Sequence, residues 1–145
     1  MNIKYYELDT IEDLLLEFAV VAAKYNNSWI YCKHKDRETF EMPGGHREKN
    51  ETIIETAKRE LFEESGAIST VLIPVAILYG ASSKNTKERF GMLYYADIEE
   101  IKELPNSEIE RIELFEKVPE NLTYPSMYPE LMDRVLLEVV QSIYK

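Results

Sequence analysis

One segment constrains the fold more than any other: a predicted helix that begins after Lys49 and ends at Gly66. Its apolar residues recur at helical spacing and form one predicted buried face, made of Ile53, Ile54, Ala57, Leu61 and Phe62. Asn50 or Thr52 can cap its start. Gly66 can end it, because glycine readily adopts a positive φ. A helix with one apolar face must pack against whatever the flanking segments form.

Extended segments flank this helix on both sides. Four apolar or aromatic runs predict strands at residues 18–25, 28–34, 71–79 and 90–98, and a short extended piece spans residues 39–42. Asn26 and Asn27 suit a tight turn between the first two strands. Residues 81–89 are expected to form a hairpin tip or a longer loop. Residues 99–125 carry three prolines and predict mostly loop, with a short element near residues 109–115.

A second helix is predicted near the end of the chain. Within residues 129–144, apolar residues stand at positions 131, 132, 135, 136, 139, 140 and 143, which is a helical stripe. Strands on both sides of one helix, followed by a second helix, predict an α/β fold in which helices cover a mixed β-sheet. We expect one domain over residues 1–145, because no linker or repeat divides the chain.

The charge of the chain limits its partners. It has 27 acidic and 17 basic residues, so its net charge is −10 at pH 7. Such a chain is a poor general binder of nucleic acid or anionic membranes, and contact with phosphates calls for a cation between them. Its single cysteine, Cys32, forms no intramolecular disulfide. The sequence shows no signal peptide and no apolar run long enough to span a bilayer, so we expect a cytoplasmic protein.

Three glutamates of the first helix favour a metal site. Glu60, Glu63 and Glu64 stand at positions i, i+3 and i+4, which places three carboxylates on one patch. Together with backbone carbonyls of Gly44 or Gly45 they provide an oxygen-only site suited to Mg²⁺ or Mn²⁺. Those glycines are expected to turn the backbone sharply. The alternative is a helix face that is only solvated.

Arg59 stands beside this acidic patch. At helical spacing it can pair with Glu55, four residues before it, or with Glu63, four residues after it. Its expected role is to hold a glutamate in one rotamer rather than to contact substrate.

Residues 45–67 resemble the Nudix box, G-x5-E-x7-R-E-U-x-E-E-x-G-U, in which U is a bulky aliphatic residue. The matching positions are Gly45, Glu51, Arg59, Glu60, Leu61, Glu63, Glu64 and Gly66. The last position departs, since Ala67 stands where a larger aliphatic residue is usual. The resemblance implies the Nudix fold, a mixed sheet sandwiched between helices. It also implies the family's reaction, which hydrolyses a nucleoside diphosphate linked to another group.

The resemblance assigns roles to these residues. Glu60, Glu63 and Glu64 would bind Mg²⁺ or Mn²⁺, assisted by a backbone carbonyl of Gly44 or Gly45. The cation would lower the pKa of the attacking water and neutralise charge on the phosphates.

A glutamate must also accept the proton of that water. Glu60 is the candidate inside the box. Family members often place a glutamate shortly before the last short element, so Glu108 is the distal candidate, with Glu110 and Glu113 as rivals. Arg59 and Glu63 complete the predicted catalytic group.

The substrate is indicated by softer features. Residues 41–46 and 119–125 resemble the branch that hydrolyses nucleoside triphosphates, including 8-oxo-dGTP. The predicted substrate contacts are Lys33, Arg37, Phe40 and Tyr124, which offer cations for phosphate oxygens and rings for stacking. Lys84, Lys87 and Arg89 are expected only to aid solubility.

We therefore expect a Mg²⁺-dependent nucleotide pyrophosphohydrolase that acts on a small nucleotide as a monomer or homodimer. A catalytically weak Nudix-fold module that only binds nucleotides is a second hypothesis, although such a module would be expected to lose box carboxylates that this chain keeps. Hydrolysis of a dinucleoside polyphosphate, a nucleotide sugar or an RNA 5′ end is a third. The net charge of −10 argues against extended contact with RNA.

Overall fold

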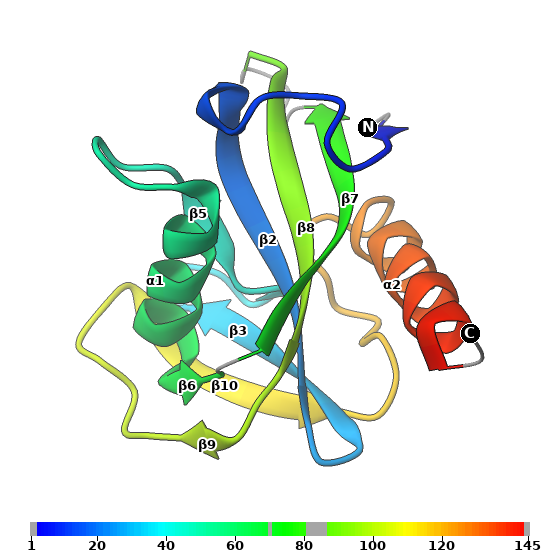
Figure 1. Ribbon diagram of the computed structural model, residues 1–145. Coiled ribbons are helices and arrows are strands. Elements are labelled where there is room, and N and C mark those ends of the chain that lie inside the picture. Colours follow the sequence, from blue (N-terminus) through cyan, green and yellow to red (C-terminus); the bar gives the residue numbers. More distant parts are fainter. Residues whose placement is uncertain (1–2, 70, 81–86, 144–145) are drawn as a thin grey trace.

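A mixed sheet lies between two helices in the computed structural model, which describes residues 3–69, 71–80 and 87–143 (Figure 1). The helices are α1 (Ile53–Ser65) and α2 (Tyr128–Ile143). The strands are β1 (Lys4–Tyr6), β2 (Leu16–Tyr25), β3 (Ser28–His34), β4 (Phe40–Glu41), β5 (Gly44–His46), β6 (Ala67–Ile68), β7 (Val71–Gly80), β8 (Arg89–Asp97), β9 (Glu100–Ile101) and β10 (Ile109–Phe115). A 3-10 turn, Asp13–Leu15, leads into β2.

β2 organises the sheet. It pairs in parallel with β8 along most of its length, and its other edge is shared between two antiparallel partners. The first half of that edge pairs with β5, and its last two residues pair with β3. The main sheet runs in the order β1-β7-β8-β2-β3-β10, while β6 and β9 form a separate small sheet. The predicted mixed sheet between helices is therefore confirmed, and the short β5 is fixed beside its central strand.

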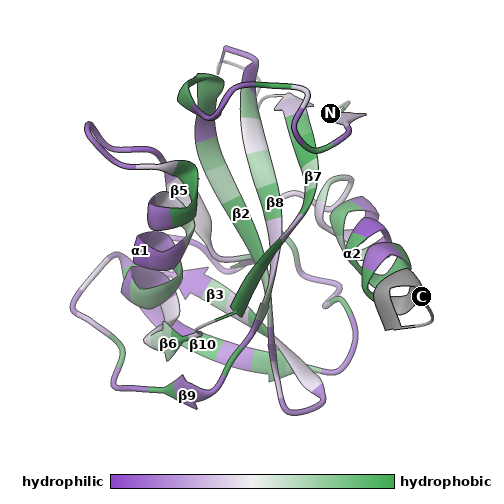
Figure 2. Cartoon of the chain, in the orientation of Figure 1, coloured by the Kyte–Doolittle hydropathy of each residue, from purple (hydrophilic) through white to green (hydrophobic). Residues whose placement is uncertain are grey.

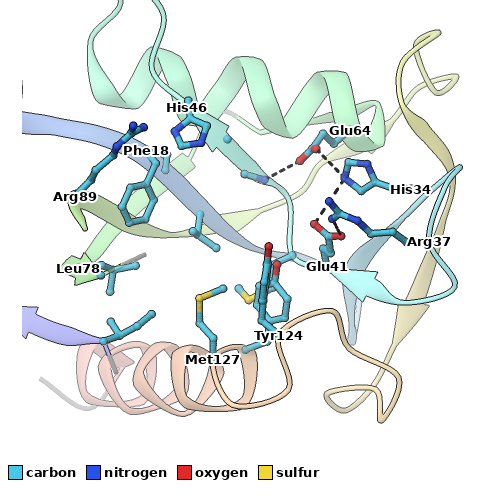
Figure 3. Close-up of a pocket in the computed structure, with 18 of the residues that line it drawn as sticks. Phe18, His34, Arg37, Glu41, His46, Glu64, Leu78, Arg89, Tyr124 and Met127 are labelled. Carbon is cyan, nitrogen blue, oxygen red and sulfur yellow. Dashed lines mark hydrogen bonds and ion pairs between the residues drawn. The ribbon is translucent and has the colours of Figure 1, made fainter. Parts of the chain in front are cut away.

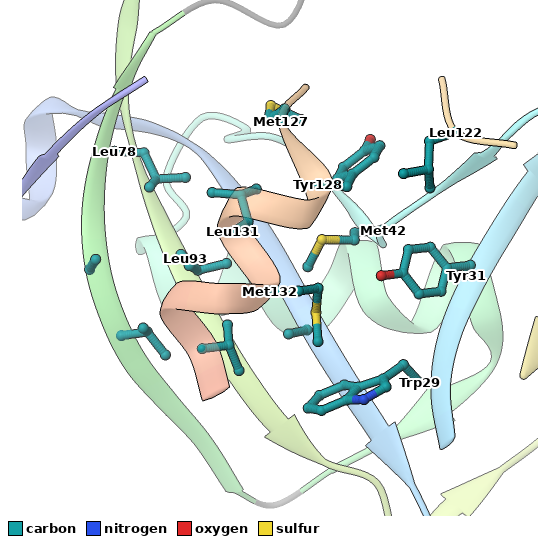
Figure 4. Packing of buried hydrophobic residues seen from close by; sticks show 14 of the residues in the cluster. Trp29, Tyr31, Met42, Leu78, Leu93, Leu122, Met127, Tyr128, Leu131 and Met132 are labelled. Atoms are coloured by element: carbon teal, nitrogen blue, oxygen red, sulfur yellow. The ribbon is translucent and has the colours of Figure 1, made fainter. Parts of the chain in front are cut away.

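Each face of the sheet carries a buried core. The core under α1 joins Ile53, Ala57 and Leu61 of the helix to residues of β2, β3, β7 and β8. The core under α2 is rich in aromatic and methionine side chains, including Trp29 and Met132 (Figure 4). Hydrophobic residues follow the central strands, whereas much of the visible side of α1 is hydrophilic (Figure 2).

The start and end of α1 are fixed by local contacts. The Thr52 hydroxyl accepts a hydrogen bond from the Glu55 backbone N–H at 3.3 Å, and the Glu55 carboxylate accepts one from the Thr52 N–H at 2.9 Å. This reciprocal pair is a capping box. Asn50 is therefore not the cap, and its backbone adopts a φ of 66° in the preceding loop. Gly66 ends the helix as predicted, with a φ of 73°.

The predicted buried face of α1 was too wide. Ile53, Ala57 and Leu61 are buried, but Ile54 is 37% and Phe62 is 40% exposed. Each of these two residues directly follows a buried position, so it is turned about 100° away from the sheet. Leu136 of α2 likewise belongs to the predicted stripe but is 46% exposed.

The remaining predictions are confirmed in outline. The four main strands and the C-terminal helix lie where the apolar patterns place them, with bounds that shift by a few residues. The short element near residues 109–115 is a seven-residue strand, β10, which pairs with β3. The two-residue strands β6 and β9 were missed because they are too short to show an alternating pattern. Of the predicted hairpin tip or loop at residues 81–89, residues 81–86 lie outside the described residues, and Arg89 already belongs to β8.

Among the described residues, no helix is long and apolar enough to cross a membrane.

The capping box should contribute measurably to stability. We expect Thr52→Ala to lower the free energy of unfolding by about 1 kcal/mol, because it removes an oxygen that accepts from the first turn of α1. Urea denaturation measures the change. Thr52→Ser keeps the hydroxyl and serves as the control, so equal midpoints for the alanine and serine variants would contradict the assignment.

Candidate active site

A cavity of about 330 Å³ opens beside β5 (Figure 3). Its acidic end is lined by Glu41 and Glu64, together with His34 and Arg37. Its middle is apolar and aromatic, with side chains from β2, β7, the link between β4 and β5, and the segment that leads into α2: Phe18, Leu78, Met42, Tyr124, Met127 and Tyr128. Its other end, as Figure 3 shows, carries His46 and Arg89.

Glu64 turns its carboxylate from the end of α1 into this cavity. Its Oε1 accepts a hydrogen bond from the Gly44 backbone N–H at 2.8 Å, and its Oε2 lies 4.0 Å from His34 Nε2. Burial raises the pKa of Glu64 to about 8; the Gly44 hydrogen bond opposes this rise, and three neighbouring glutamates add to it. A carboxylate in such surroundings binds a proton or another cation more readily than an exposed one.

Glu60 packs directly on β5. A Cβ atom at Gly45 would lie 2.4 Å from Glu60 Cδ, so only glycine admits the carboxylate there. Arg59 Nη1 donates a hydrogen bond to Glu60 Oε1 at 2.6 Å. Burial raises the pKa of Glu60, although the bond from Arg59 opposes this.

The expectation that Gly44 and Gly45 turn the backbone sharply is wrong. Both residues form β5 and pair with Val20 and Ala19 of β2. Their value lies in the missing side chain rather than in an unusual φ. A Cβ at Gly44 would lie 2.4 Å from the Ala19 carbonyl oxygen, just as one at Gly45 would clash with Glu60.

Arg59 gathers the acidic residues of this segment. Its Nε and Nη2 donate to the two carboxylate oxygens of Glu51 at 2.6 and 3.0 Å. Its Nη1 donates to Glu63 at 3.3 Å as well as to Glu60. The Arg59 hydrogen bonds lower the pKa of Glu51 to about 2. The predicted pairing with Glu63 is confirmed, whereas pairing with Glu55 is wrong because that carboxylate caps the start of α1.

The donor atoms suit a hard divalent cation, although the side chains are not gathered around one point. Among the described residues, no three His, Cys, Asp or Glu side chains form a group that could hold a metal ion as they stand. The cause is visible in the contacts: Arg59 holds Glu60 and Glu63, while Glu64 is turned toward β5. Two largely buried carboxylates with raised pKa values fit the oxygen chemistry of such a cation. Glu63 is 48% exposed, which leaves it room to rotate.

His34 and Glu41 are functional candidates that the sequence analysis missed. His34 Nε2 lies 3.6 Å from the Glu41 carboxylate and 4.0 Å from that of Glu64. Glu41 also accepts hydrogen bonds from Arg37 Nη1 and from Thr123 Oγ1, the latter at 2.9 Å. It therefore ties β4 to the loops that follow β3 and precede α2. Successive side chains of a strand point to opposite faces, so His34 and Lys33 lie on opposite faces of β3. This alternation is the signal in the sequence that could have indicated His34.

Glu108 lies at the same acidic end. It stands in the loop before β10, its side chain is 90% exposed, and its Oε2 lies 4.0 Å from His34 Nδ1. Its rivals are engaged elsewhere: Glu110 pairs with Lys33 and Arg111, and Glu113 pairs with Arg111.

The structure brings two of the four predicted substrate contacts to the cavity. Arg37 and Tyr124 both line it (Figure 3). Lys33 does not, because its buried ammonium lies 3.3 and 3.8 Å from the carboxylates of two glutamates outside the cavity. Phe40 does not either, since its ring packs in the core against a second phenylalanine ring at 5.1 Å.

The expectation that Lys87 and Arg89 only aid solubility is wrong in one respect, because both line the cavity. Arg89 begins β8, next to the central strand, and so stands closer to the site than a loop-tip residue would. Lys84, which shares that expectation, lies outside the described residues.

Comparison with known proteins agrees with the geometry. The model of the NUDIX domain family matches residues 16–135. The protein YtkD of Bacillus subtilis (strain 168), provisionally named an 8-oxo-dGTP diphosphatase, is 30% identical over 122 residues, which cover 82% of this chain and 74% of that relative.

Solved structures share the fold. The pyrophosphohydrolase BsRppH of Bacillus subtilis, solved as a point mutant, superposes with a TM-score of 0.78 at 24% identity, and the match covers 93% of this chain and 90% of that one. The NUDIX domain of Shewanella oneidensis NrtR, solved with ADP ribose, has a TM-score of 0.62 at 12% identity, with coverage of 90% and 94%.

A mixed sheet between two helices, with Glu60 packed on a glycine strand, agrees with the match to the NUDIX domain family. The chain belongs to the Nudix family, and it is a pyrophosphohydrolase that acts on phosphoric anhydrides.

The contact between Glu60 and β5 can be tested by adding one methyl group. We expect Gly45→Ala to lower kcat by about 100-fold, because a displacement of the carboxylate near 1 Å is enough for a loss of that order. Steady-state kinetics measure the effect, and thermal melting checks that β5 remains paired. Turnover within about twofold of the wild type would show that the position of Glu60 does not matter.

Proposed function

We propose that this protein hydrolyses a nucleoside triphosphate of the 8-oxo-dGTP type to the monophosphate and pyrophosphate, with Mg²⁺ or Mn²⁺. One observation carries the proposal: a single cavity joins the buried carboxylate of Glu64 to an apolar, aromatic wall. Carboxylates of this kind suit a cation that accompanies phosphates, and the wall suits a base. The name of the Bacillus subtilis relative YtkD supports the same substrate class.

In this proposal, Glu60, Glu63 and Glu64 hold the cation, with a backbone carbonyl of Gly44 or Gly45. When bound, the cation supplies charge neutralisation on the phosphates and lowers the pKa of water. Arg59 does not touch substrate in this scheme. It keeps Glu60 and Glu63 in place, and Glu51 fixes the guanidinium by accepting hydrogen bonds from Nε and Nη2.

Proton transfer needs a base close to the phosphates. Glu60 is the candidate in the box, because its raised pKa and its position on β5 put a basic carboxylate beside the glycine backbone. Glu108 is the distal candidate, since its exposed carboxylate lies near His34 at the acidic end. Loss of turnover in Glu60→Gln alone, or in Glu108→Gln alone, distinguishes the two.

The nucleoside would lie against the aromatic side of the cavity, near the start of α2 and across from β5. Tyr124 and Tyr128 stand with ring centroids 5.8 Å apart, and Met127 lies between them in the sequence. Tyr124 is only partly buried and is therefore available for stacking on a base. Thr123 anchors this loop through Glu41, so the stacking ring is held against the site.

A substrate panel tests the function directly. The purified protein with Mg²⁺ is offered 8-oxo-dGTP, unmodified nucleoside triphosphates, a dinucleoside polyphosphate, a nucleotide sugar and a triphosphorylated RNA. We expect release of pyrophosphate and a monophosphate from the triphosphates, which places the cut between the α and β phosphates. Preferential cleavage of another class would refute the triphosphate assignment, and binding without turnover would favour a nucleotide-binding module.

The carboxylates of α1 should matter far more for rate than for stability. We expect Glu63→Gln and Glu64→Gln each to reduce kcat by several orders of magnitude, because each removes a charge from the proposed cation site. The fold should survive, since like charges on one helix repel one another. Glu116→Gln, at an exposed acid after β10, is the matched control. Near-normal turnover of both variants at saturating Mg²⁺ would exclude the metal assignment.

Cation binding should also stabilise the folded state. An ion at a hundred times its Kd adds about 2.7 kcal/mol to the free energy of unfolding when it binds the native state alone. We expect Mg²⁺ or Mn²⁺ to raise the melting temperature more than NaCl at matched ionic strength, which corrects for screening. The excess should vanish in Glu60→Gln/Glu64→Gln. Equal shifts for all salts would mean that the acidic patch is only solvated.

A further inference from the structure

Two basic side chains, Arg89 and Lys87, line the cavity, and Figure 3 shows Arg89 at the end opposite Glu64. Within residues 3–69, 71–80 and 87–143, no carboxylate lies within ion-pair distance of either of them. The guanidinium of Arg59, by contrast, is surrounded by glutamates. The net charge of the chain is −10, but these two cations line one cavity and make it locally favourable for an anion.

This cationic end lies beside the strand residue on which Glu60 packs. His46 directly follows Gly45, on which Glu60 packs, and it pairs with Phe18 of β2. On the other edge of β2, Leu16 pairs with Phe90, which directly follows Arg89. His46 and Arg89 therefore flank the start of β2, and Figure 3 shows them together at one end of the cavity, with Glu64 at the other.

A second, more open hollow of about 550 Å³ continues from this point. His46 and Arg89 line both hollows. These two side chains therefore stand where the first cavity meets the second hollow, which is also lined by Glu17, Glu48 and Glu51. The position suits the part of a substrate that extends beyond the cleaved diphosphate.

We propose that Arg89, with Lys87 and His46, binds the terminal phosphate of a nucleoside triphosphate and so makes the enzyme prefer triphosphates to diphosphates. The inference rests on the proposed function, because it assumes that the diphosphate to be cleaved lies over Gly44 and Gly45.

The chemistry favours a phosphate over a neutral group at this end. A guanidinium offers several N–H donors in a planar fork that matches two phosphate oxygens, and a lysine ammonium adds charge. The imidazole of His46 can donate a further N–H. A substrate whose leaving group ends in an uncharged sugar would leave Arg89 and Lys87 facing no anion. The site therefore discriminates by the number of phosphates.

Binding of uncleavable nucleotides isolates this effect from turnover. The probes are the α,β-methylene analogues of guanosine triphosphate and guanosine diphosphate, titrated by calorimetry with Mg²⁺ present. We expect the wild type to bind the triphosphate analogue at least about tenfold more tightly, a difference typical of a charge-assisted phosphate contact. Arg89→Gln should abolish most of that ratio and leave the affinity for the diphosphate analogue within about twofold of the wild type.

Lys58→Gln is the matched control, because it removes the same charge from an exposed position on α1 that does not line the cavity. It should keep the wild-type ratio, and thermal melting shows whether either variant has lost its fold. Added NaCl should reduce the ratio in the wild type, since screening weakens a contact between charges.

Two results would overturn the inference. The wild type could bind both analogues equally, or Arg89→Gln could weaken both by the same factor, in which case Arg89 contacts the base or ribose. These results are distinct from failure of the proposed function. If the substrate panel shows triphosphate cleavage while the binding ratio is near one, only the terminal-phosphate site is wrong.

Discussion

Burial of two carboxylates against the glycine strand is the constraint on which the rest of the structure depends. Glu60 and Glu64 are both largely removed from water, and burial raises the pKa of each. Ionised groups in that position disfavour folding unless something compensates them. Arg59 compensates Glu60, and the backbone N–H of Gly44 compensates Glu64 in part. Glu60 fits against β5 because Gly45 has no side chain, whereas the missing side chain of Gly44 makes room for the Ala19 carbonyl oxygen of β2. The pairing of β5 with β2, together with the fixed ends of α1, holds Arg59, Glu60 and Glu64 in place against β5.

The two ends of the resulting cavity differ in charge. Glu41 and Glu64 stand at one end, beside His34 and Arg37, and Arg89 and His46 stand at the other. A divalent cation would convert the acidic end into a phosphate site, whereas the basic end can meet an anion without one. This division explains how a chain of net charge −10 can recruit a polyanion: the attraction is local, and the overall charge does not govern it.

The sequence predicted what local pattern determines and missed what strand register determines. Spacing located α1 and its end and left its cap open between Asn50 and Thr52, and the box made Glu60, Glu63 and Glu64 the candidate metal ligands. The pairing of Arg59 with Glu51 spans eight residues and depends on the loop before α1, so helical spacing pointed to Glu55 instead. Phe40 is buried in the core, whereas Tyr124 lines the cavity, although both are aromatic residues near glycine or proline turns. Arg89 needed the pairing of β8 with β2 before it could be placed at the site.

The same contacts suit hydrolysis of nucleotides rather than binding alone. Burial raises the pKa of Glu64 to about 8. Above the ordinary pKa of glutamate, such a carboxylate lowers the stability of the folded chain. A protein that only binds nucleotides would gain nothing from it. The aromatic wall would hold a base without it. The hydrogen bonds of Arg59 support the same conclusion. Two of them, to Glu51, hold the guanidinium in place, and the guanidinium in turn orients Glu60 and Glu63. None of them is needed to form the cavity. Carboxylates concentrated beside a nucleotide-sized cavity lower the stability of the fold. The chemistry of phosphoric anhydride hydrolysis explains why the chain has them.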